Sequence, residues 1–463
     1  MWKAFKHLLV LTIVSLPGLI LAQPKVPSLH ELIDSALHKD YNFANRQLDI
    51  QSANIDQLKL KEAYLPRIDI IAKDAFLLSS FGVKSNELII PDLNIDIKEH
   101  KNRYTTTSNL VAAVAEASML LYSGGKIPQL KKALNEKIKA QTFILEKDRQ
   151  EIISEVTKAY DQLALLKQIR RVLDESEKRL AENMKAADKA FGYGLITKYE
   201  RQKIEVSQAQ LSSKILEYEG KRGLVLQQLY LLTNVDKERL AIISNTLISF
   251  DNVSFEHGIE NRAELKALDA TIAANGFKIK AEKTWFIPKV QAAGSLGYFG
   301  LLAGHVSSSE PILPNGKKLS SDLPNLNVLP VFNVGIGFKW NFFDGKEGKH
   351  EVQKAEIERE KSINDKKEAT DKLELNLANA QTNYTTAVAQ VNVKNKQQQI
   401  AENALTQATK EYRIGLIKTA QLIDAEDDFQ NAALDYVQAI FNQRRAAIDL
   451  LKATGNLTVQ SIQ

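Results

Sequence analysis

The residue types that carry enzyme and metal chemistry are sparse in this sequence and form no recognisable motif. Its 463 residues include seven His, three Met and no Cys. No pair of His follows the H-E-x-x-H pattern, which places two zinc ligands on one helix face. The absence of Cys excludes disulfides, thiolate metal sites and a Cys nucleophile. With no visible set of acid, base and nucleophile, the sequence predicts neither an enzyme nor a cofactor site.

The sequence also gives little support for the binding of phosphate groups or nucleic acid. Gly294, Gly297 and Gly300 are spaced like a glycine-rich loop, but they lie in a predicted strand with no helix after it. No G-x-x-x-x-G-K-[ST] loop is present, so the sequence does not predict a nucleotide-binding site of that type. The 61 basic and 56 acidic residues nearly balance, which gives no reason to expect a nucleic-acid partner.

The N-terminus has the composition of a secretory signal peptide. Two lysines precede an apolar run from Leu8 to Leu21, and Ala22 is a small residue suited to cleavage. A membrane anchor is the alternative, but the run is shorter than the roughly 20 apolar residues that span a bilayer. We therefore expect residues 1–22 to be removed and the remaining chain to leave the cytoplasm.

The remaining chain contains one unit twice. Leu121-Tyr122-Ser123-Gly124 returns as Phe342-Phe343-Asp344-Gly345, and Gly194-Leu195-Ile196 returns as Gly415-Leu416-Ile417, both 221 positions later. Several weak similarities at one offset indicate an internal repeat. The predicted repeats are residues 23–234 and 259–455, with a linker at 235–258 and a tail at 456–463.

Each repeat is predicted to hold one very long helix. No Gly or Pro lies between Pro128 and Gly192, and apolar residues recur there at every seventh position from Ile138 to Leu180. A sustained heptad pattern is typical of coiled-coil packing. At 1.5 Å per residue such a helix reaches roughly 100 Å. The predicted helices are 28–64, 124–191 and 197–233 in the first repeat, and 259–285, 346–414 and 418–454 in the second.

Each repeat also holds a pair of candidate strands, at about 66–122 and 288–344. From Val331 to Phe342, large apolar residues alternate with small or polar ones, which predicts a strand with one apolar face. Strands that face lipid have this pattern, and so do strands of an ordinary half-buried sheet. We expect the segments near 80–103 and 304–327 to be long external loops.

Four strands are too few to close a membrane barrel, since the smallest bacterial ones use eight. Open strand edges in lipid leave backbone groups without partners, so several chains must contribute strands. The number of copies stays open at this point, because two, three or four would each give an even strand count.

The order of these elements resembles the TolC-like outer-membrane efflux protein family. The resemblance rests on Leu65-Pro66 and Ile287-Pro288 before the strand pairs, on the two strand-to-helix turns, and on the two Gly-Leu-Ile tips. It covers the chain from about Ser28 to Thr454. It implies a mainly α fold with a β membrane part: a homotrimer with four strands per chain in one twelve-stranded β-barrel, continued by a periplasmic α-helical barrel.

The resemblance also implies a function without catalysis. The chain would be the outer-membrane exit duct of a tripartite efflux or type I secretion system, with its helices in the periplasm. Its partners would be two further copies, a periplasmic adaptor protein, an inner-membrane transporter and outer-membrane lipid. The substrate and the energy source are not implied. The residues leave one alternative open, a secreted trimeric coiled-coil scaffold or adhesin without a channel.

The helix tips are the adaptor-docking candidates that the resemblance implies. The residues are Gly194, Leu195, Gly415 and Leu416. The alternative is that Gly194 and Gly415 are ordinary turn glycines.

Just inside the tips, family members close the duct with carboxylates bound to a Tyr and an Arg. The matching positions here are Glu200, Tyr412, Gln421 and Asp424. Ile417 stands where the arginine is expected, so we expect a partial gate, with Lys198 or Lys418 as candidate substitutes. Solvated acids on a helix face are the alternative interpretation of Glu200 and Asp424.

Overall fold

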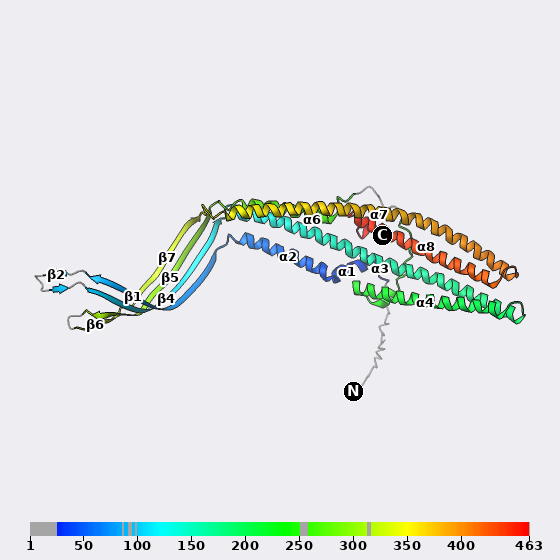
Figure 1. The fold of residues 1–463 in the computed structure, drawn as a ribbon, viewed down its shortest axis with the longest axis horizontal. Helices are drawn as coiled ribbons and strands as arrows, with labels where there is room; N and C mark the ends of the chain where they lie inside the picture. The colour runs from blue at the N-terminus through cyan, green and yellow to red at the C-terminus, as the bar shows by residue number, and fades with distance from the viewer. Residues whose placement is uncertain are drawn as a thin grey trace, which may run out of the picture. The chain divides into compact units, whose positions relative to one another are not determined.

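The computed structural model of the chain describes residues 26–85, 88–90, 95–97, 100–250, 258–312 and 316–462 (Figure 1). The predicted signal peptide lies outside these residues, as does part of the predicted linker. Contacts divide the chain into two compact units. The helical unit contains the described residues up to Gln47 together with 144–265 and 369–463, and the sheet unit contains 48–143 and 266–368. Each unit therefore draws on both predicted repeats.

Long helices dominate the chain. They are α1 (Leu29–Lys39), α2 (Tyr41–Glu62), α3 (Lys126–Gly192), α4 (Lys198–Thr233), α5 (Lys237–Ala241), α6 (Ala263–Glu282), α7 (Glu347–Arg413) and α8 (Thr419–Ala453), with a 3-10 turn at Gln460–Ile462. The two longest, α3 and α7, have 67 residues each, and their ends differ by 221 positions. The internal repeat is therefore a repeat of structure.

The heptad residues of α3 form the core of the helical unit. Leu166, Leu173 and Leu180 are buried in one cluster with Leu211 and Tyr218 of α4. Helices that present an apolar residue every three or four positions bury that stripe against a similar helix. In the second repeat, Leu405, Ala408 and Leu422 form the matching contact between α7 and α8.

The first helix is interrupted where the sequence predicted one helix over 28–64. Helix α1 ends at Lys39, and Asp40 is extended. The Asp40 carboxylate accepts a hydrogen bond of 2.7 Å from the backbone N–H of Phe43 in the first turn of α2. Asp competes with the helical backbone for such bonds and favours helix starts, which is why the helix breaks here.

The sheet is antiparallel and joins the two repeats. Its strands are β1 (Arg67–Ser85), β4 (His100–Tyr122), β5 (Lys289–Pro311), β6 (Lys318–Leu323) and β7 (Leu326–Lys339), with a separate pair formed by β2 (Leu88–Ile90) and β3 (Ile95–Ile97). Strand β4 of the first repeat pairs with β5 of the second. On the far side of β5, β7 pairs with its first half and β6 with its second half. The sheet thus has four strand positions, with β7 and β6 sharing the fourth (Figure 1).

The loops expected near 80–103 and 304–327 are largely strand. Strand β1 continues to Ser85 opposite His100, and β5 continues to Pro311 opposite Lys318. These extensions are rich in Ser and Thr, so they show no apolar alternation. Backbone pairing needs no apolar side chains, so a prediction based on apolar alternation underestimates the length of the strands. At the other end, β7 stops at Lys339, short of the predicted Phe342.

The turn from β4 into α3 requires glycine more strongly than its counterpart in the second repeat. Gly124 and Gly345 both have φ of +68°, a left-handed conformation that costs other residues about 1–2 kcal/mol. A Cβ on Gly124 would lie 3.1 Å from the Ile287 carbonyl oxygen, whereas a Cβ on Gly345 would meet nothing within 4 Å.

We expect Gly124→Ala to lower the melting temperature of the purified protein clearly more than Gly345→Ala. Equal shifts in the two melting curves would contradict the role of the close approach to Ile287.

Candidate functional site

The strand register gives the sheet two chemically different faces. One, the apolar face, carries large apolar side chains at alternate positions of the edge strands: Ile68, Ile70, Phe76 and Leu78 on β1, and Phe332, Val334, Ile336 and Phe338 on β7. The opposite, polar face carries Arg67, Asp69 and Lys73 on β1, Glu116 and Ser118 on β4, Ser295 on β5, and Asn333, Gly335 and Gly337 on β7. There are exceptions on both faces: Asp74 shares the apolar face with Ile70 and Phe76, and Ile71 and Leu77 lie on the polar face of β1.

Within the described chain, the apolar face is not covered. Phe332, Val334 and Ile336 are 69%, 74% and 75% exposed. A contiguous apolar surface of this kind marks contact with lipid or with another protein. Its alternation with a small and polar face is the pattern of a strand with lipid on one side and water on the other.

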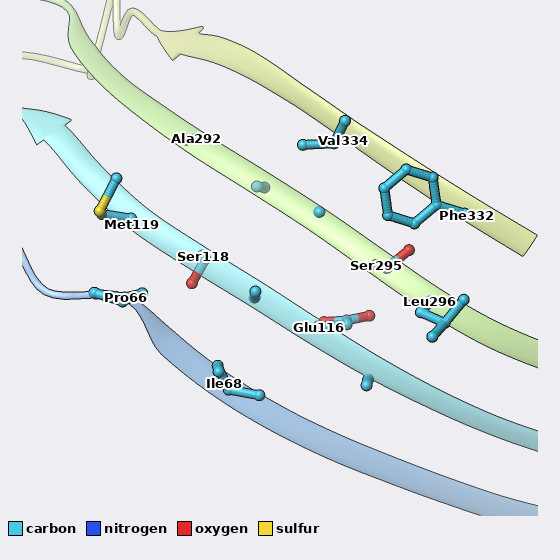
Figure 2. A pocket seen from close by; sticks show the side chains of 14 residues that line it. Pro66, Ile68, Glu116, Ser118, Met119, Ala292, Ser295, Leu296, Phe332 and Val334 are labelled. Atoms are coloured by element: carbon cyan, nitrogen blue, oxygen red, sulfur yellow. The ribbon is translucent and has the colours of Figure 1, made fainter.

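A shallow groove crosses the apolar face (Figure 2). Small residues of the two central strands, among them Ala117, Ala292 and Gly294, form its floor. Ile68 of β1 and the side chains of Phe332 and Val334 of β7 rise on either side. The groove encloses about 530 Å³, and its exposed surface is almost entirely apolar. The face therefore stays apolar across the groove.

Aromatic side chains gather where the strands meet the helices. Phe286, Trp340, Phe342 and Phe343 are all exposed, and the Trp340 indole N–H donates to the Phe286 carbonyl over 2.9 Å. Aromatic rings at one end of an apolar band are typical of a membrane–water interface, because they combine an apolar body with a polar edge.

Both helix tips close with the same hydrogen-bond pattern. Gly194 and Gly415 have φ of +71° and +76°. The N–H of Leu195 donates to the Ala190 carbonyl over 2.8 Å, and the N–H of Leu416 donates to the Glu411 carbonyl over 2.9 Å. Glycine in a left-handed conformation with this long backbone bond is the Schellman end of a helix. The side chains of Leu195 and Leu416 are left exposed, so each tip presents an apolar residue.

Two of the gate candidates, Glu200 and Gln421, occupy equivalent positions at the starts of α4 and α8. The Glu200 carboxylate accepts from the Thr197 N–H over 3.1 Å, and the Thr197 hydroxyl accepts from the Glu200 N–H over 3.2 Å. The Gln421 side chain accepts from the Lys418 N–H over 3.0 Å. These side chains satisfy backbone groups at the starts of their own helices, as in a capping box.

The other two gate candidates lie in different surroundings. The Tyr412 hydroxyl lies 3.3 Å from that of Thr419. Its ring packs with Ile417 on the buried cluster that contains Leu422. Asp424 is exposed and lines a groove together with residues of α4 and α8. Among the described residues, no hydrogen bond or ion pair joins any two of the four candidates, or joins Lys198 or Lys418 to Glu200 or Asp424.

Acidic residues crowd the helix surface next to Asp424. Burial raises the pKa of Asp427, the positive charge of Lys214 opposes the shift, and the negative charges of Asp424 and Asp428 add to it. Negative charge is therefore concentrated on α8 within three turns of its tip.

A set of ion pairs that no sequence motif predicts joins α3 of the first repeat to α8 of the second. Arg179 pairs with Glu426 at 2.8 Å, Arg444 with Asp161 at 3.0 Å, and Lys158 with Asp449 at 2.6 Å. The partners lie more than 240 positions apart in the sequence, so no local motif could have predicted the pairs. These pairs fix an antiparallel alignment of the two helices.

The carboxylates of Asp161 and Glu426 are the least solvated of these charges. The Asp161 side chain is 2% exposed, and one of its oxygens has no hydrogen-bond partner. Burial raises the pKa of Asp161, and the charge and hydrogen bond of Arg444 counteract that rise. Arg444 also donates to the Ile248 carbonyl over 3.1 Å, so one guanidinium holds both α3 and the segment after α5.

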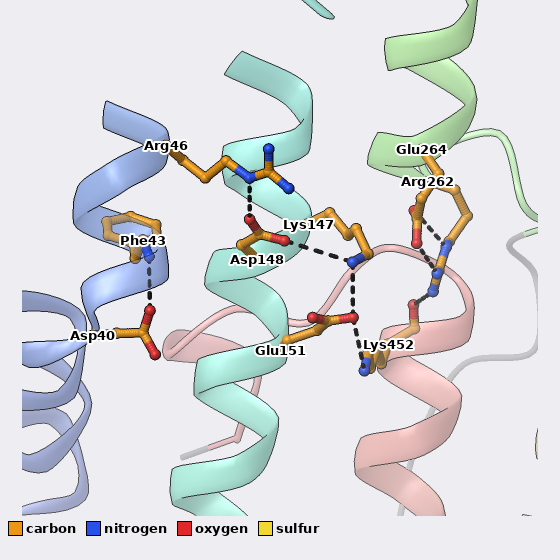
Figure 3. A network of polar contacts seen from close by, with 9 residues as sticks. All are labelled: Asp40, Phe43, Arg46, Lys147, Asp148, Glu151, Arg262, Glu264 and Lys452. Carbon is orange, nitrogen blue, oxygen red and sulfur yellow. Dashed lines mark hydrogen bonds and ion pairs between the residues drawn. The ribbon is translucent and has the colours of Figure 1, made fainter. Parts of the chain in front are cut away.

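A more exposed network joins three helices further along the helical unit (Figure 3). Arg46 of α2 pairs with Asp148 of α3 at 3.4 Å, and Lys147 lies between Asp148 and Glu151 at 3.5 and 3.1 Å. Glu151 in turn lies 3.9 Å from Lys452 of α8. Exposed pairs of this kind each contribute about 0–1 kcal/mol, so breaking one of them should cost less than removing one partner of a buried pair.

Two further properties concern the part of the chain that the structure describes. It contains no group of three or more His, Asp or Glu side chains placed to hold a metal ion. None of its helices is both long enough and apolar enough to cross a membrane.

Comparison with known proteins gives one family and one fold. Residues 257–456 match the family model described as outer membrane efflux protein. No curated protein sequence matches the chain.

Among solved structures, the chain is similar to the Campylobacter jejuni outer membrane channel CmeC, with 17% identity, a TM-score of 0.65, and coverage of 92% of this chain and 85% of that one. It is similar to VceC of Vibrio cholerae, with 17% identity, a TM-score of 0.67, and coverage of 92% and 96%. It is also similar to the open state of the Neisseria gonorrhoeae MtrE channel, with 16% identity, a TM-score of 0.63, and coverage of 93% and 91%. Residues 257–456 thus resemble the outer membrane efflux protein family, and the chain as a whole has the TolC-like fold of outer-membrane efflux channels.

Proposed function

We propose that this chain is the exit duct of a tripartite efflux or secretion system in the outer membrane. The apolar face of the sheet contacts lipid, and the polar face lines a water-filled passage. The observation that carries the proposal is the alternation along β7, where exposed Phe332, Val334 and Ile336 are separated by Asn333 and Gly335. The aromatic residues around Trp340 lie where the periplasmic membrane surface would be.

Three copies complete the wall. In the described sheet, β1 pairs with β4 alone, and the β7 edge pairs with β5 alone. Inside a lipid bilayer these edges must pair with other strands, since an unpaired backbone group there costs several kcal/mol. Pairing β1 of one copy with β7 of the next closes a barrel with four strand positions from each copy, and the family resemblance favours three copies.

The helices form the periplasmic part of the duct and dock the other components. The exposed Leu195 and Leu416 at the tips offer apolar contacts to a periplasmic adaptor, which in turn joins an inner-membrane transporter. A passage of this kind works by its shape and polarity, so the chain needs no catalytic group. The transporter supplies the energy.

The alternative, a secreted scaffold with a soluble sheet, does not account for the apolar face. A soluble protein rarely leaves a contiguous apolar surface exposed on a sheet whose other face is polar. A scaffold also has no need of an aromatic cluster at one end of that surface. Both features follow at once if the sheet lies in a membrane.

Single-channel recording in planar lipid bilayers tests the duct. We expect the purified wild-type protein to give discrete conductance steps of small size, because the helix tips narrow the passage. Folded, oligomeric protein that inserts into the bilayer but never conducts would contradict the duct.

We propose that the gate is centred on Asp424, which is exposed near the tip, while Tyr412 packs on the cluster that contains Leu422 and the side chains of Glu200 and Gln421 cap their helix starts. We expect Glu200→Ala/Asp424→Ala to conduct more than wild type, because three copies lose acids at the narrow end. Asp435→Ala, further up α8 and paired with Lys394 at 2.8 Å, is the control and should conduct like wild type. Identical recordings from all three proteins would keep the duct and remove these acids as the gate.

A further inference from the structure

We infer that Arg179 and Glu426 form the link that holds the two helical hairpins of one chain together and keeps the inner end of the duct narrow. The hairpins are α3 with α4 and α7 with α8. The inference rests on the proposed duct function, and it assigns a positioning role to two residues outside the gate candidates.

The geometry of the pair is that of a strong, directed contact. The Arg179 Nε lies 2.9 and 3.0 Å from the two carboxylate oxygens of Glu426, and Nη2 lies 2.8 Å from Oε1. Nη2 also donates to the Ser176 hydroxyl over 3.0 Å, and the guanidinium lies 5.0 Å from the centre of the Phe429 ring. Ser176 and Phe429 thus fix the orientation of the guanidinium, which is a condition for a stabilising buried pair.

Burial makes the pair act as a switch between two states. The Glu426 side chain is 2% exposed, while Arg179 is 29% exposed. If the hairpins separate without water reaching Glu426, a buried charge is left without compensation, which is strongly unfavourable. The pair therefore resists partial separation and favours either contact or full opening.

The position of the pair suits this role. Among the hydrogen bonds and ion pairs between the two hairpins in the described residues, this one lies nearest the tips. Arg179 precedes the end of α3 at Gly192 by 13 positions, or about 20 Å of helix. Widening the inner end requires the hairpins to move apart along this stretch.

The internal repeat shows that the link is present once in each chain. The position equivalent to Glu426, 221 residues earlier, is Glu205, which is half-exposed and pairs with Arg201 of its own helix. The position equivalent to Arg179 is Ile400, which is exposed. The two repeats share a fold, yet only Glu426 has a charge partner on the other hairpin, whereas Glu205 is paired within its own helix.

Charge reversal and its rescue test the link in single-channel recordings. We expect Arg179→Glu and Glu426→Arg each to raise the open probability by about tenfold or more, equivalent to at least about 1.4 kcal/mol. The double variant Arg179→Glu/Glu426→Arg should return toward wild type, which a merely structural defect would not do. Lys178→Glu is the matched control, since Lys178 is the neighbouring residue on α3, is exposed and pairs with Glu175 of the same helix. Single reversals that behave like this control, or a double variant as open as either single one, would overturn the inference.

Covalent joining gives a test that does not depend on how well the charge variants fold. The chain has no Cys, so Arg179→Cys/Glu426→Cys carries the only two thiols and can be joined by a cleavable bis-maleimide. We expect opening events to disappear after joining and to return after cleavage. Opening that continues while the two helices are joined would overturn the inference. A wild-type protein without any channel would instead contradict the proposed duct, so the two failures are distinguishable.

Discussion

Val334→Arg is expected to prevent the chain from assembling in the outer membrane, whereas Gly335→Arg, one position further along the same strand, is expected to be tolerated. Val334 lies on the apolar face, and an arginine facing lipid near the bilayer centre costs about 2–4 kcal/mol in each copy. Gly335 lies on the polar face, and a Cβ there would meet nothing within 4 Å. The two variants add the same charge to the same strand, so only the face differs.

Membrane fractions run on gels with and without heating measure this difference. Gly335→Arg should show the heat-dependent migration of a folded barrel at close to the wild-type level, and Val334→Arg should be lost from the membrane fraction. Equal amounts of both folded variants would contradict the assignment of the faces.

The second large effect is a loss of stability in Arg444→Ala. This change leaves the Asp161 carboxylate buried without its ion-pair partner, and breaking such a pair costs about 3–5 kcal/mol. Lys158→Ala is the comparison on the same pair of helices, because its pair with Asp449 is more exposed and should cost about 1 kcal/mol or less. Urea unfolding of the detergent-solubilised protein, followed by helical circular dichroism, measures both. Similar losses in the two variants would contradict the special cost of Asp161.

The loss in Arg444→Ala should depend on pH with a definite sign. Burial already raises the pKa of Asp161 in the folded protein, and removing Arg444 raises it further. A carboxyl group with a raised folded pKa contributes its stability below its ordinary pKa of about 3.9 and loses it as the pH rises through the raised value. The deficit of Arg444→Ala relative to wild type should therefore be largest near neutral pH and shrink as the pH is lowered toward 4. Asp161→Asn in the same background should remove most of this pH dependence, and a deficit that stays constant with pH would exclude Asp161 as its source.

The elements with a strict period were predictable from the sequence, because their pattern is internal to one segment. The heptads from Ile138 to Leu180 predict α3, and Leu166, Leu173 and Leu180 are buried in one cluster with residues of α4. The alternation around Val334 predicts β7 and its two faces. The Ser- and Thr-rich ends of β1 and β5 carry no such pattern, since their pairing depends on backbone atoms alone, and they were expected to be loops. Asp40 broke the first helix through a local hydrogen bond that competes with helix continuation.

The candidate site was less predictable, because its contacts join distant segments. The family resemblance assigns Glu200 to a gate. Thr197, three positions earlier, already forms the sequence pattern of a capping box with it, and the structure uses the Glu200 side chain in that way. Glu426 lies only two positions from the predicted Asp424, but its partner Arg179 is 247 residues away. Only the packing of α8 on α3 shows which acid is buried. The acids near the tip can be identified from the sequence, whereas the ion-pair partner of each one depends on how the helices pack.

The most direct test of the central claim is a cysteine scan along β7 in the membrane-inserted protein. The chain has no Cys, so each variant from Phe332 to Phe338 carries a single thiol. We expect a water-soluble, membrane-impermeant maleimide to label positions 333, 335 and 337 on the polar face. Positions 332, 334, 336 and 338 on the apolar face should react only with a lipid-soluble reagent. Labelling by the water-soluble reagent at every position, without alternation, would mean that both faces meet water and would contradict a lipid-embedded wall around an aqueous duct.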